Sequence, residues 1–477
     1  MADCQQRTVT TDGLSPDASA MRESILGHLP YSPLPGQVLV VEALAEFATG
    51  RDPRAVMVLN GYAGTGKTSI MGAFVKAMAA HRKKTVVLAP TGRAAKVAAR
   101  FAGGLASTIH KRIFRADSLE PDAGYFPAAN TDRDTIFIVD EASLITDSPS
   151  DPRSLLLALT RHVYSAPGCA MILVGDTAQL PPVGQSDSPA MNPDRLRALG
   201  LTPSMMQLDQ PVRQAAESGI LRNATAVRRM LAAGFAGIPA LKVSGFDDVV
   251  AISSADLADA LSDSWSSVGA EETLIVTRSN KRANKFNQAI RSIVMMAEEP
   301  LQRGDRLVIA KNDYYWCKQN KLKQFIANGD TAVVDWVGNT EKMYGRWFSD
   351  VELTLPAEGI SMSAKIMLRS LNSEGPSLPQ SDMERLYQHV LAAQGGDTLT
   401  NRIRTAVADP YYNALQAKYA YCVTCHKAQG GQWRHVYIDM GNIDIREAGS
   451  DFYRWLYTAM TRATEKVFLV NPTLKIL

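Results

Sequence analysis

Short apolar runs alternate with amphipathic segments from about residue 55 onward. The first four runs read "AVMVLN", "TVVLAP", "TIFIVD" and "CAMILVGD". Between the first two runs, Ile70, Phe74 and Met78 recur every four residues, which predicts a helix with one buried face. Strands that alternate with helices indicate a parallel sheet covered by helices. A second series begins at "EETLIVT" and returns at "YAYCVT", "HVYIDM" and "KVFLV", so the pattern predicts two α/β layers.

One interval, residues 338–415, breaks this rhythm. It contains period-two stretches such as "DVELTL" and "SAKIML", followed by the Gly/Ser/Pro-rich segment "LNSEGPSLPQSD" and by "AAQGGDT". Alternation of this kind is typical of half-buried strands, so we expect a small β-rich insertion with a loose or helical tail. The predicted division is a flexible polar tail over 1–29, a first layer over 30–210, a second layer over 211–337 and 416–477, and the insertion between.

Composition narrows the class of protein. The chain has 477 residues, a formal net charge of +3 and five cysteines. An odd number of thinly spread cysteines fits reduced thiols better than a disulfide framework. The N-terminus lacks the basic start and apolar run of a signal peptide, and no apolar run approaches the roughly 20 residues that span a bilayer. We therefore expect a cytoplasmic protein that binds any anionic ligand through a local site.

The most specific motif is a full G-x-x-x-x-G-K-[ST] between a predicted strand and a predicted helix. Its glycines let successive N–H groups face phosphates, its lysine reaches the β/γ oxygens, and its threonine offers a hydroxyl to Mg²⁺. We therefore predict an ATP site with Mg²⁺ as cofactor. The residues assigned to it are Gly61, Ala63, Gly64, Thr65, Gly66, Lys67, Thr68 and Ser69.

Polar residues at the ends of two later strands complete this site. Asp140 and Glu141 follow "TIFIV"; we assign Asp140 to the Mg²⁺ shell with Thr68, and Glu141 to activation of the attacking water. Asp176 and Gln179 follow the next strand, on the edge where ligands bind in open α/β sheets. Gln179 is a candidate sensor of the γ-phosphate.

The stretch "YCVTCHKAQGGQW" raises two other possibilities. Cys422-x-x-Cys425-His426 matches the attachment pattern of a c-type haem, and a Cys pair also suggests zinc. Haem attachment needs an export route, which the N-terminus does not indicate. Zinc at finger spacing needs a second pair of ligands, which the sequence lacks.

Eight blocks in order resemble the helicase motifs of superfamily 1, most closely the RecD/Dda branch. They are GYAGTGKTS, APTGRAA, STIHKRI, IVDEAS, VGDTAQLPPVG, LDQPVRQ, VTCHKAQGGQW and LYTAMTRA, and the resemblance covers about residues 30 to 470. The Cys-x-x-Cys-His stretch is then the family's T-x-H-K-x-Q-G block. The implied fold class is α/β, with two RecA-like P-loop NTPase domains and an SH3-like β-rich insertion in the second.

The resemblance also assigns residues. It makes Arg213 and Arg462 the arginines that approach the γ-phosphate, and Gln37 the glutamine that reads adenine. It places a strand-separating pin over 114–133, with Tyr125 and Phe126 as the candidate wedge. The implied contacts to DNA are Thr91, Arg93, His110, Thr277, Asn280, Thr424 and His426.

The function implied is an ATP-dependent DNA helicase that moves 5′→3′ on single-stranded DNA and unwinds duplex. The implied partners are single-stranded DNA, 5′-tailed duplex DNA and other replication or repair proteins, bound by a monomer in the cytoplasm of a bacterial or phage-infected cell. Two alternatives remain: a DNA-stimulated translocase that does not unwind alone, because the pin region is short, and a P-loop kinase of small molecules. A kinase does not need the block from Thr424 to Gln432 or a second α/β layer.

Overall fold

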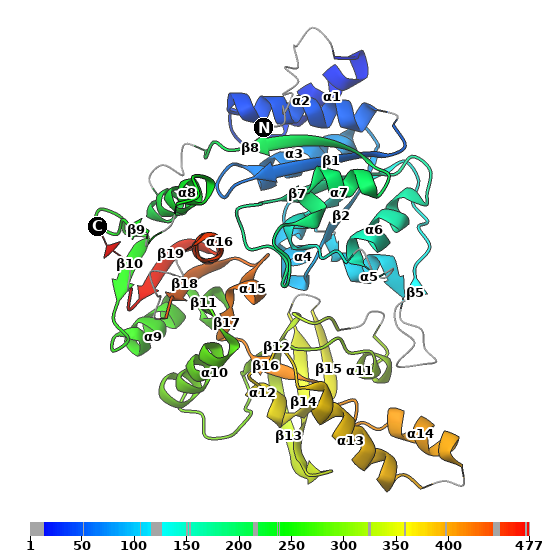
Figure 1. Ribbon diagram of the computed structural model, residues 1–477, viewed down its shortest axis with the longest axis vertical. Helices are drawn as coiled ribbons and strands as arrows, with labels where there is room; N and C mark the ends of the chain where they lie inside the picture. Colours follow the sequence, from blue (N-terminus) through cyan, green and yellow to red (C-terminus); the bar gives the residue numbers. More distant parts are fainter. Residues whose placement is uncertain are drawn as a thin grey trace. The chain divides into compact units, whose positions relative to one another are not determined.

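The computed structural model describes residues 14–50, 52–104, 106–115, 126–148, 151, 154–212, 218–235, 237, 239–322, 326–356, 359–395, 398–441, 449–472 and 475–476. The chain forms two compact units (Figure 1). Unit 1 comprises Met1–Pro90, Ala94–Ile113 and Pro127–Arg222, and unit 2 comprises Thr91–Arg93, Phe114–Phe126 and Asn223–Leu477.

Unit 1 is built on a parallel sheet with the strand order β3-β2-β6-β7-β1-β8. The strands are β1 Ala55–Gly61, β2 Lys84–Ala89, β3 Ala106–Thr108, β6 Thr135–Val139, β7 Ala170–Gly175 and β8 Thr202–Leu208. The short strands β4 Phe114–Arg115 and β5 Phe126–Pro127 pair with each other, and Phe114–Phe126 is assigned to unit 2. Every residue of β6 is buried, as expected for a strand with helices on both faces.

The helices of the N-terminal half precede, connect or follow these strands. They are α1 Pro16–Gly27, α2 Pro35–Thr49, α3 Lys67–Ala80, α4 Gly92–Ala99, α5 Ile109–Ile113, α6 Leu155–Tyr164, α7 Pro193–Ala198 and α8 Gly219–Ala232, with 3₁₀ turns at Ala142–Leu144 and Pro189–Met191. The predicted stripe on α3 is confirmed, because Ile70, Phe74 and Met78 are all buried in the core of unit 1.

The prediction of a flexible tail over 1–29 is wrong for residues 16–27, which form helix α1. Ser15 caps this helix through its side chain, and a proline occupies the first turn. Met21 and Ile25, one turn apart, are buried in the same core as α2 and α3. Burial of two large apolar side chains stabilises the helix by about 3 to 6 kcal/mol, which its low intrinsic amphipathicity does not reveal. Residues 1–13 lie outside the described residues.

Unit 2 contains a second parallel sheet, ordered β10-β19-β18-β11-β17. The strands are β10 Val249–Ile252, β11 Thr273–Thr277, β17 Cys422–Thr424, β18 Trp433–Asp439 and β19 Ala463–Val470, and a small pair is formed by β9 Ala240–Leu241 and β20 Lys475–Ile476. In the view of Figure 1, helices α9 and α10 lie below this sheet and α16 above it. The helices are α9 Leu257–Val268, α10 Asn280–Ala289, α15 Cys425–Ala428 and α16 Ser450–Met460, with a 3₁₀ turn at Ala270–Glu272 and a π-helical turn at Ile290–Val294.

The insertion in unit 2 is an antiparallel sheet ordered β15-β14-β13-β12-β16. Its strands are β12 Arg306–Ile309, β13 Thr331–Met343, β14 Arg346–Leu355, β15 Ile360–Met367 and β16 Ala417–Tyr419, and α11 Tyr315–Gln319 and α12 Leu368–Leu371 accompany them. The predicted fold class, two parallel sheets and a β-rich insertion, is confirmed. The predicted boundaries at 338 and 415 are wrong, because the first divides β13 and the second excludes β12 and β16. Apolar β12 resembles a parallel strand in sequence, and only its antiparallel partners assign it to the insertion.

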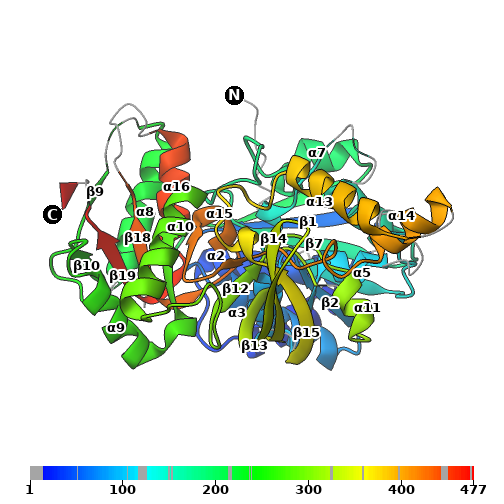
Figure 2. The same ribbon diagram turned by 90° about the horizontal axis from the view of Figure 1, so that it is seen from below.

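The segment predicted as a loose or helical tail forms two helices, α13 Gln380–Ala393 and α14 Leu399–Val407. Figures 1 and 2 both show them extending away from strands β13 to β15. They share a small core with the sheet, in which Phe348, Met367, Leu386 and Val390 are buried. In the part of the chain that the structure describes, no helix has the length and apolarity needed to cross a membrane.

Candidate nucleotide and DNA site

The phosphate-binding loop joins β1 to α3 in unit 1. Gly64 and Gly66 have φ angles of +73° and +87°, in the left-handed region that glycine adopts without strain. A Cβ atom on Gly66 would lie 2.5 Å from the hydroxyl of Tyr31 and 2.6 Å from Nε2 of Gln37, so the position has no room for a side chain. Both the backbone conformation and the lack of room for a side chain therefore require glycine at position 66.

The ammonium group of Lys67 lies against this loop. It donates hydrogen bonds to the carbonyl oxygens of Gly61 and, at 3.0 Å, of Tyr62. A Cβ atom on Gly61 would lie 2.6 Å from Cγ of Lys67, so this glycine gives the lysine stem its path along the loop. Thr68, the next residue on α3, has an exposed side chain and can offer its hydroxyl to a metal ion. The loop thus presents one cation and one hydroxyl at a helix N-terminus.

Asp140 and Glu141 follow β6, at the same edge of the sheet at which β1 delivers the loop. Burial raises the pKa of the Asp140 carboxyl to about 7; the charge of Glu141 adds to this rise, and the charge of Lys67 opposes it. Oδ1 of Asp140 accepts a hydrogen bond of 2.9 Å from the backbone N–H of Glu141. A divalent cation would supply the opposite charge that these two neighbouring carboxylates need in order to be ionised together, so the residues fit Mg²⁺.

Among the residues that the structure describes, no three His, Cys, Asp or Glu side chains are grouped as a metal site. Mg²⁺ in nucleotide sites is held by few protein groups and by the phosphates themselves, and Asp140 and Thr68 would be the protein groups here. Glu141 itself has a φ angle of +52°, which costs a residue with a side chain about 1 to 2 kcal/mol. Strained backbone of this kind clusters at functional sites.

Gln179 lies on the loop after β7, the strand between β6 and β1. Its side chain is 5% exposed, and within the described part of the chain its Oε1 has no hydrogen-bond partner. An unsatisfied buried amide oxygen is costly and points to an absent polar group. Asp176 braces this loop by accepting a hydrogen bond from the N–H of Ala178 at 3.0 Å. Asn60, which the sequence analysis missed, accepts another from the N–H of Thr177 at 3.1 Å.

Gln37 is buried beneath the phosphate loop, with 1% of its side chain exposed. Its Oε1 accepts a hydrogen bond of 2.9 Å from the N–H of Leu34, and its Nε2 donates one of 2.9 Å to the carbonyl of Thr65 and one of 3.3 Å to the hydroxyl of Tyr31. The amide therefore couples the start of α2 to the loop. Tyr31 was also missed, and its place six residues before Gln37 gave no signal.

In unit 2, Thr277 and Thr424 end two neighbouring parallel strands and are register partners. Thr277 is fully buried, and its hydroxyl donates a hydrogen bond of 3.1 Å to the carbonyl of Ser279. Asn280 begins α10 directly after this turn, and His426 on α15 has an exposed side chain. The structure thus brings four of the predicted DNA-contacting residues to the ends of adjacent strands.

Arg462 follows α16 and is 4% exposed. Its Nε donates to the carbonyl of Thr458 at 3.0 Å, and its two terminal nitrogens donate to the carbonyl of Gly431 and to the hydroxyl of Thr461, both at 3.2 Å. A surface ion pair is therefore not its role. Arg213 lies outside the described residues, as does Tyr125, and only the backbone of Phe126 is described.

Arg93, assigned to unit 2, packs on the segment that carries the T-x-H-K-x-Q-G block. Its guanidinium lies 3.7 Å from the ring centroid of Trp433 and donates a hydrogen bond of 3.2 Å to the carbonyl of Gln432. Thr91 and His110 are both partly exposed, and burial lowers the pKa of His110. Trp433 was missed by the sequence analysis.

The thiols of Cys422 and Cys425 are both buried. Burial raises the pKa of Cys425 to about 12 and that of Cys422 well above its usual value. The thiolate is the form that binds metals, and a dry environment disfavours it. The surroundings of both cysteines are therefore those of core residues, and not those of metal ligands.

A phosphate-binding loop with paired carboxylates on the edge of a parallel sheet defines a P-loop nucleotide-binding protein. Residues 35–236 match the AAA domain family, and residues 419–470 match the UvrD-like helicase C-terminal domain. Both matches support the resemblance of the chain to superfamily 1 helicases of the RecD/Pif1-like branch. The resemblance of the eight blocks is thereby confirmed.

Two curated relatives are similar to the chain, one over about a third of its length and the other over most of it. The ATP-dependent RecD2 DNA helicase of Deinococcus radiodurans is 34% identical over 175 residues, which are 35% of this chain and 21% of that protein. The chain thus matches about a fifth of that relative's length. Protein R530 of Acanthamoeba polyphaga mimivirus, described as uncharacterized, is 21% identical over 504 residues, 90% of this chain and 98% of that protein.

Two solved structures are also similar. The Pif1 helicase from Bacteroides in complex with ADP-AlF3 and ssDNA has a TM-score of 0.47 and 14% identity, with 93% of each chain covered. The Pif1 helicase from Candida albicans has a TM-score of 0.44 and 15% identity, with 93% of this chain and 95% of that chain covered.

Proposed function

We propose that this chain couples ATP hydrolysis to 5′→3′ movement on single-stranded DNA and to the unwinding of duplex DNA. The observation that carries this proposal is the register pairing of Thr277 and Thr424 in a second parallel sheet, within a chain whose first sheet carries the phosphate loop. A small-molecule kinase needs only the first sheet. The partly exposed hydroxyl of Thr424, at the carboxyl edge of the second sheet, suits a contact to a phosphate backbone.

Each residue of the nucleotide site has a proposed task. Lys67 stabilises the charge of the β/γ-phosphates, and Thr68 and Asp140 hold Mg²⁺, which when bound neutralises phosphate charge. Glu141 accepts a proton from the attacking water, and the unpaired amide oxygen of Gln179 orients that water or senses the γ-phosphate. The other loop residues, Gly61 to Ser69, wrap the phosphates with their N–H groups.

The proposed arginines and Gln37 act around this centre. Arg462 and Arg213 stabilise the negative charge of the transferring phosphoryl group, because a guanidinium fork matches its oxygens. Gln37 reads the adenine edge, since an amide can both donate to and accept from it. For this role, its amide must exchange the partners Leu34 and Thr65 for the base.

The DNA residues and the pin complete the proposal. Thr91, Arg93, His110, Asn280, Thr424 and His426 contact the strand, and Tyr125 with Phe126 stacks on a base at the fork. Thr277, predicted to contact DNA, is fully buried and instead holds the turn that precedes Asn280. The pairing of β4 with β5, which flank residues 116–125, supports the proposed pin. A translocase that does not unwind alone is the second candidate. It is favoured by the shortness of the pin region in the sequence, residues 114–133.

Strand displacement on 5′-tailed and 3′-tailed duplexes tests the proposal, with ATPase turnover measured on the same tails. We expect ATP- and Mg²⁺-dependent displacement of the 5′-tailed duplex only, and none by Lys67→Ala. Turnover stimulated by the tail without displacement favours the translocase. Stimulation by a small acceptor, and not by oligonucleotide, supports the kinase.

A further inference from the structure

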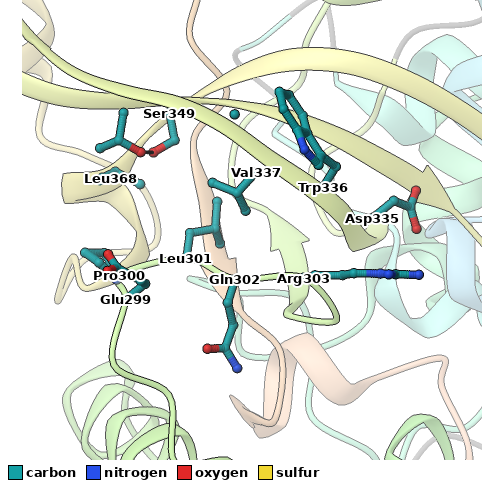
Figure 3. A pocket seen from close by; sticks show the side chains of 12 residues that line it. Glu299, Pro300, Leu301, Gln302, Arg303, Asp335, Trp336, Val337, Ser349 and Leu368 are labelled. Carbon is teal, nitrogen blue, oxygen red and sulfur yellow. Dashed lines mark hydrogen bonds between the residues drawn. The ribbon is translucent and has the colours of Figure 1, made fainter.

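A cavity of about 420 Å³ opens on the antiparallel insertion of unit 2 (Figure 3). Its walls come from residues 299–303, from 335–338 and Thr340 on β13, from Ser349 on β14 and from Leu368 on α12. None of these residues belongs to the nucleotide site or to the proposed DNA contacts. The cavity therefore has no task in the proposed helicase reaction.

The indole of Trp336 forms one wall of the cavity. A glycine and two register shifts in β13 determine where this side chain lies. Its side chain remains 53% exposed, which is unusual for so large an apolar group. A Cβ atom on Gly338 would lie 2.3 Å from Cη2 of this ring, so the ring lies flat across a glycine that leaves room for it. Register shifts of β13 occur on both sides of Trp336 and Val337. Bulges of this kind re-aim side chains next to binding sites.

The opposite wall is held rigid by a buried network. Arg291, on the π-helical turn, forms two hydrogen bonds of 3.0 Å to Asp305 and donates another of 2.8 Å to the carbonyl of Glu299. The hydroxyl of Tyr419 donates to the carbonyl of Pro300. Because the wall is fixed before any ligand arrives, little ordering entropy is lost on binding.

The charges around the cavity favour a cationic ligand. Glu299 and Asp335 line it together with Arg303, and Glu352, the exposed register partner of Trp336, adds a third carboxylate on the same face. Figure 3 shows Asp335 beside Trp336 at one end, and the apolar side chains of Pro300 and Leu368 at the other. An excess of carboxylates repels the phosphates of a nucleic acid.

We propose that this cavity binds an extended, proline-containing peptide of a partner protein that carries an arginine or lysine. A polyproline II segment is pre-formed, so it binds without a large loss of entropy, and its rings pack on aromatic surfaces. One proline lies on the indole of Trp336, a second fills the apolar end near Leu368, and the cation pairs with Asp335. The insertion thereby binds a partner protein through residues that belong neither to the nucleotide site nor to the proposed DNA contacts.

The test uses the full chain and a panel of fluorescently labelled Pro-x-x-Pro peptides, each with one arginine before, between or after the prolines. Matched peptides carry glutamate in place of arginine, and a labelled oligo-dT is the nucleic-acid probe. Fluorescence anisotropy gives each affinity. Trp347 provides the matched control variant, because it is also 53% exposed on the same sheet and does not line the cavity.

We expect saturable binding of at least one arginine peptide, and weaker binding of its glutamate counterpart. Trp336→Ala should weaken binding about tenfold or more, as for an aromatic hot spot, and Trp347→Ala should not. Asp335→Asn should weaken it severalfold and reduce its salt dependence, because the amide oxygen can still accept the hydrogen bond from Thr354. An unchanged thermal unfolding midpoint confirms that each variant is folded.

Three outcomes overturn the proposal. In the first, no peptide of the panel binds saturably. In the second, a peptide binds Trp336→Ala as tightly as the natural chain, so the site lies elsewhere. In the third, Trp336→Ala weakens binding of oligo-dT and leaves peptide binding unchanged, which assigns the indole to base stacking.

Discussion

The guanidinium of Arg462 donates a hydrogen bond of 3.2 Å to the backbone carbonyl of Gly431. This bond links the segment after α16 to the segment after α15, so two of the helicase blocks share one buried arginine. The arginine is thus positioned by main-chain carbonyls, and its orientation depends on both blocks.

Removal of this arginine should slow catalysis more than it weakens nucleotide binding. We expect Arg462→Ala to lower DNA-stimulated ATP turnover by about a hundredfold or more, because in the proposed mechanism its charge acts chiefly in the transition state. The loss of buried hydrogen bonds should also cost about 1 to 3 kcal/mol of stability. Arg462→Lys is the control, since it keeps the charge without the fork. A lower melting temperature with normal turnover would show that the role is structural.

Glu141→Gln should retain binding of Mg·ATP and hydrolyse it slowly. An amide cannot accept the proton of the attacking water, and loss of a general base costs about 10² to 10⁴ in rate. The substitution is nearly isosteric, so the left-handed backbone at this position should persist. Single-turnover hydrolysis and equilibrium binding of a fluorescent ATP analogue separate the two effects. Normal single-turnover rates would remove Glu141 from the mechanism.

Gln37→Ala should affect both stability and nucleotide choice. Its buried amide bonds to Leu34 and Thr65, and their loss should cost about 1 to 3 kcal/mol in the free energy of unfolding. If the amide also reads adenine, the preference for ATP over GTP in kcat/KM should disappear. Steady-state kinetics with both nucleotides and thermal unfolding measure the two quantities. An equal fall for ATP and GTP would leave only the structural role.

Cys422→Ser and Cys425→Val should leave ATPase activity intact. Both thiols are buried, and their high pKa values disfavour the thiolate that haem attachment or zinc would need. The expected cost is a packing loss of about 1 kcal/mol for each. Metal analysis and visible absorption of the purified natural chain are the measurements, and stoichiometric zinc or covalent haem would contradict the assignment.

Tyr125→Ala combined with Phe126→Ala should lower unwinding and leave single-strand-stimulated ATPase nearly unchanged. Stacking of a ring on a base is worth about 1 to 3 kcal/mol, which is comparable to the mean of about 1.4 kcal/mol per base-pair step that a fork must supply. Strand displacement on a 5′-tailed duplex is compared with ATPase on the tail alone. A parallel fall of both rates assigns the pair to structure, and no fall places the separating element elsewhere, for example in the insertion.

The sequence by itself determined the two-layer α/β fold, the phosphate loop and the polar residues at the strand ends. These features are local: a run of β-branched residues predicts a strand, and Gly61 to Thr68 has one conformation that suits phosphates. The order of the eight motif blocks along the chain then identified them as helicase motifs. Asn60, the polar last residue before that loop, is a brace that a closer look at the strand end could have found.

Only the tertiary structure decided what depends on contacts between distant residues. Helix α1 is stabilised by burial of Met21 and Ile25 against α2 and α3, which no local pattern reveals. Strand β12 belongs to the insertion because it pairs antiparallel with β13 and β16, and the partners of a strand are not encoded within its own sequence. The same holds for the partners of Gln37 and for the indole of Trp336 above Gly338, because burial and hydrogen bonding are properties of the packed chain.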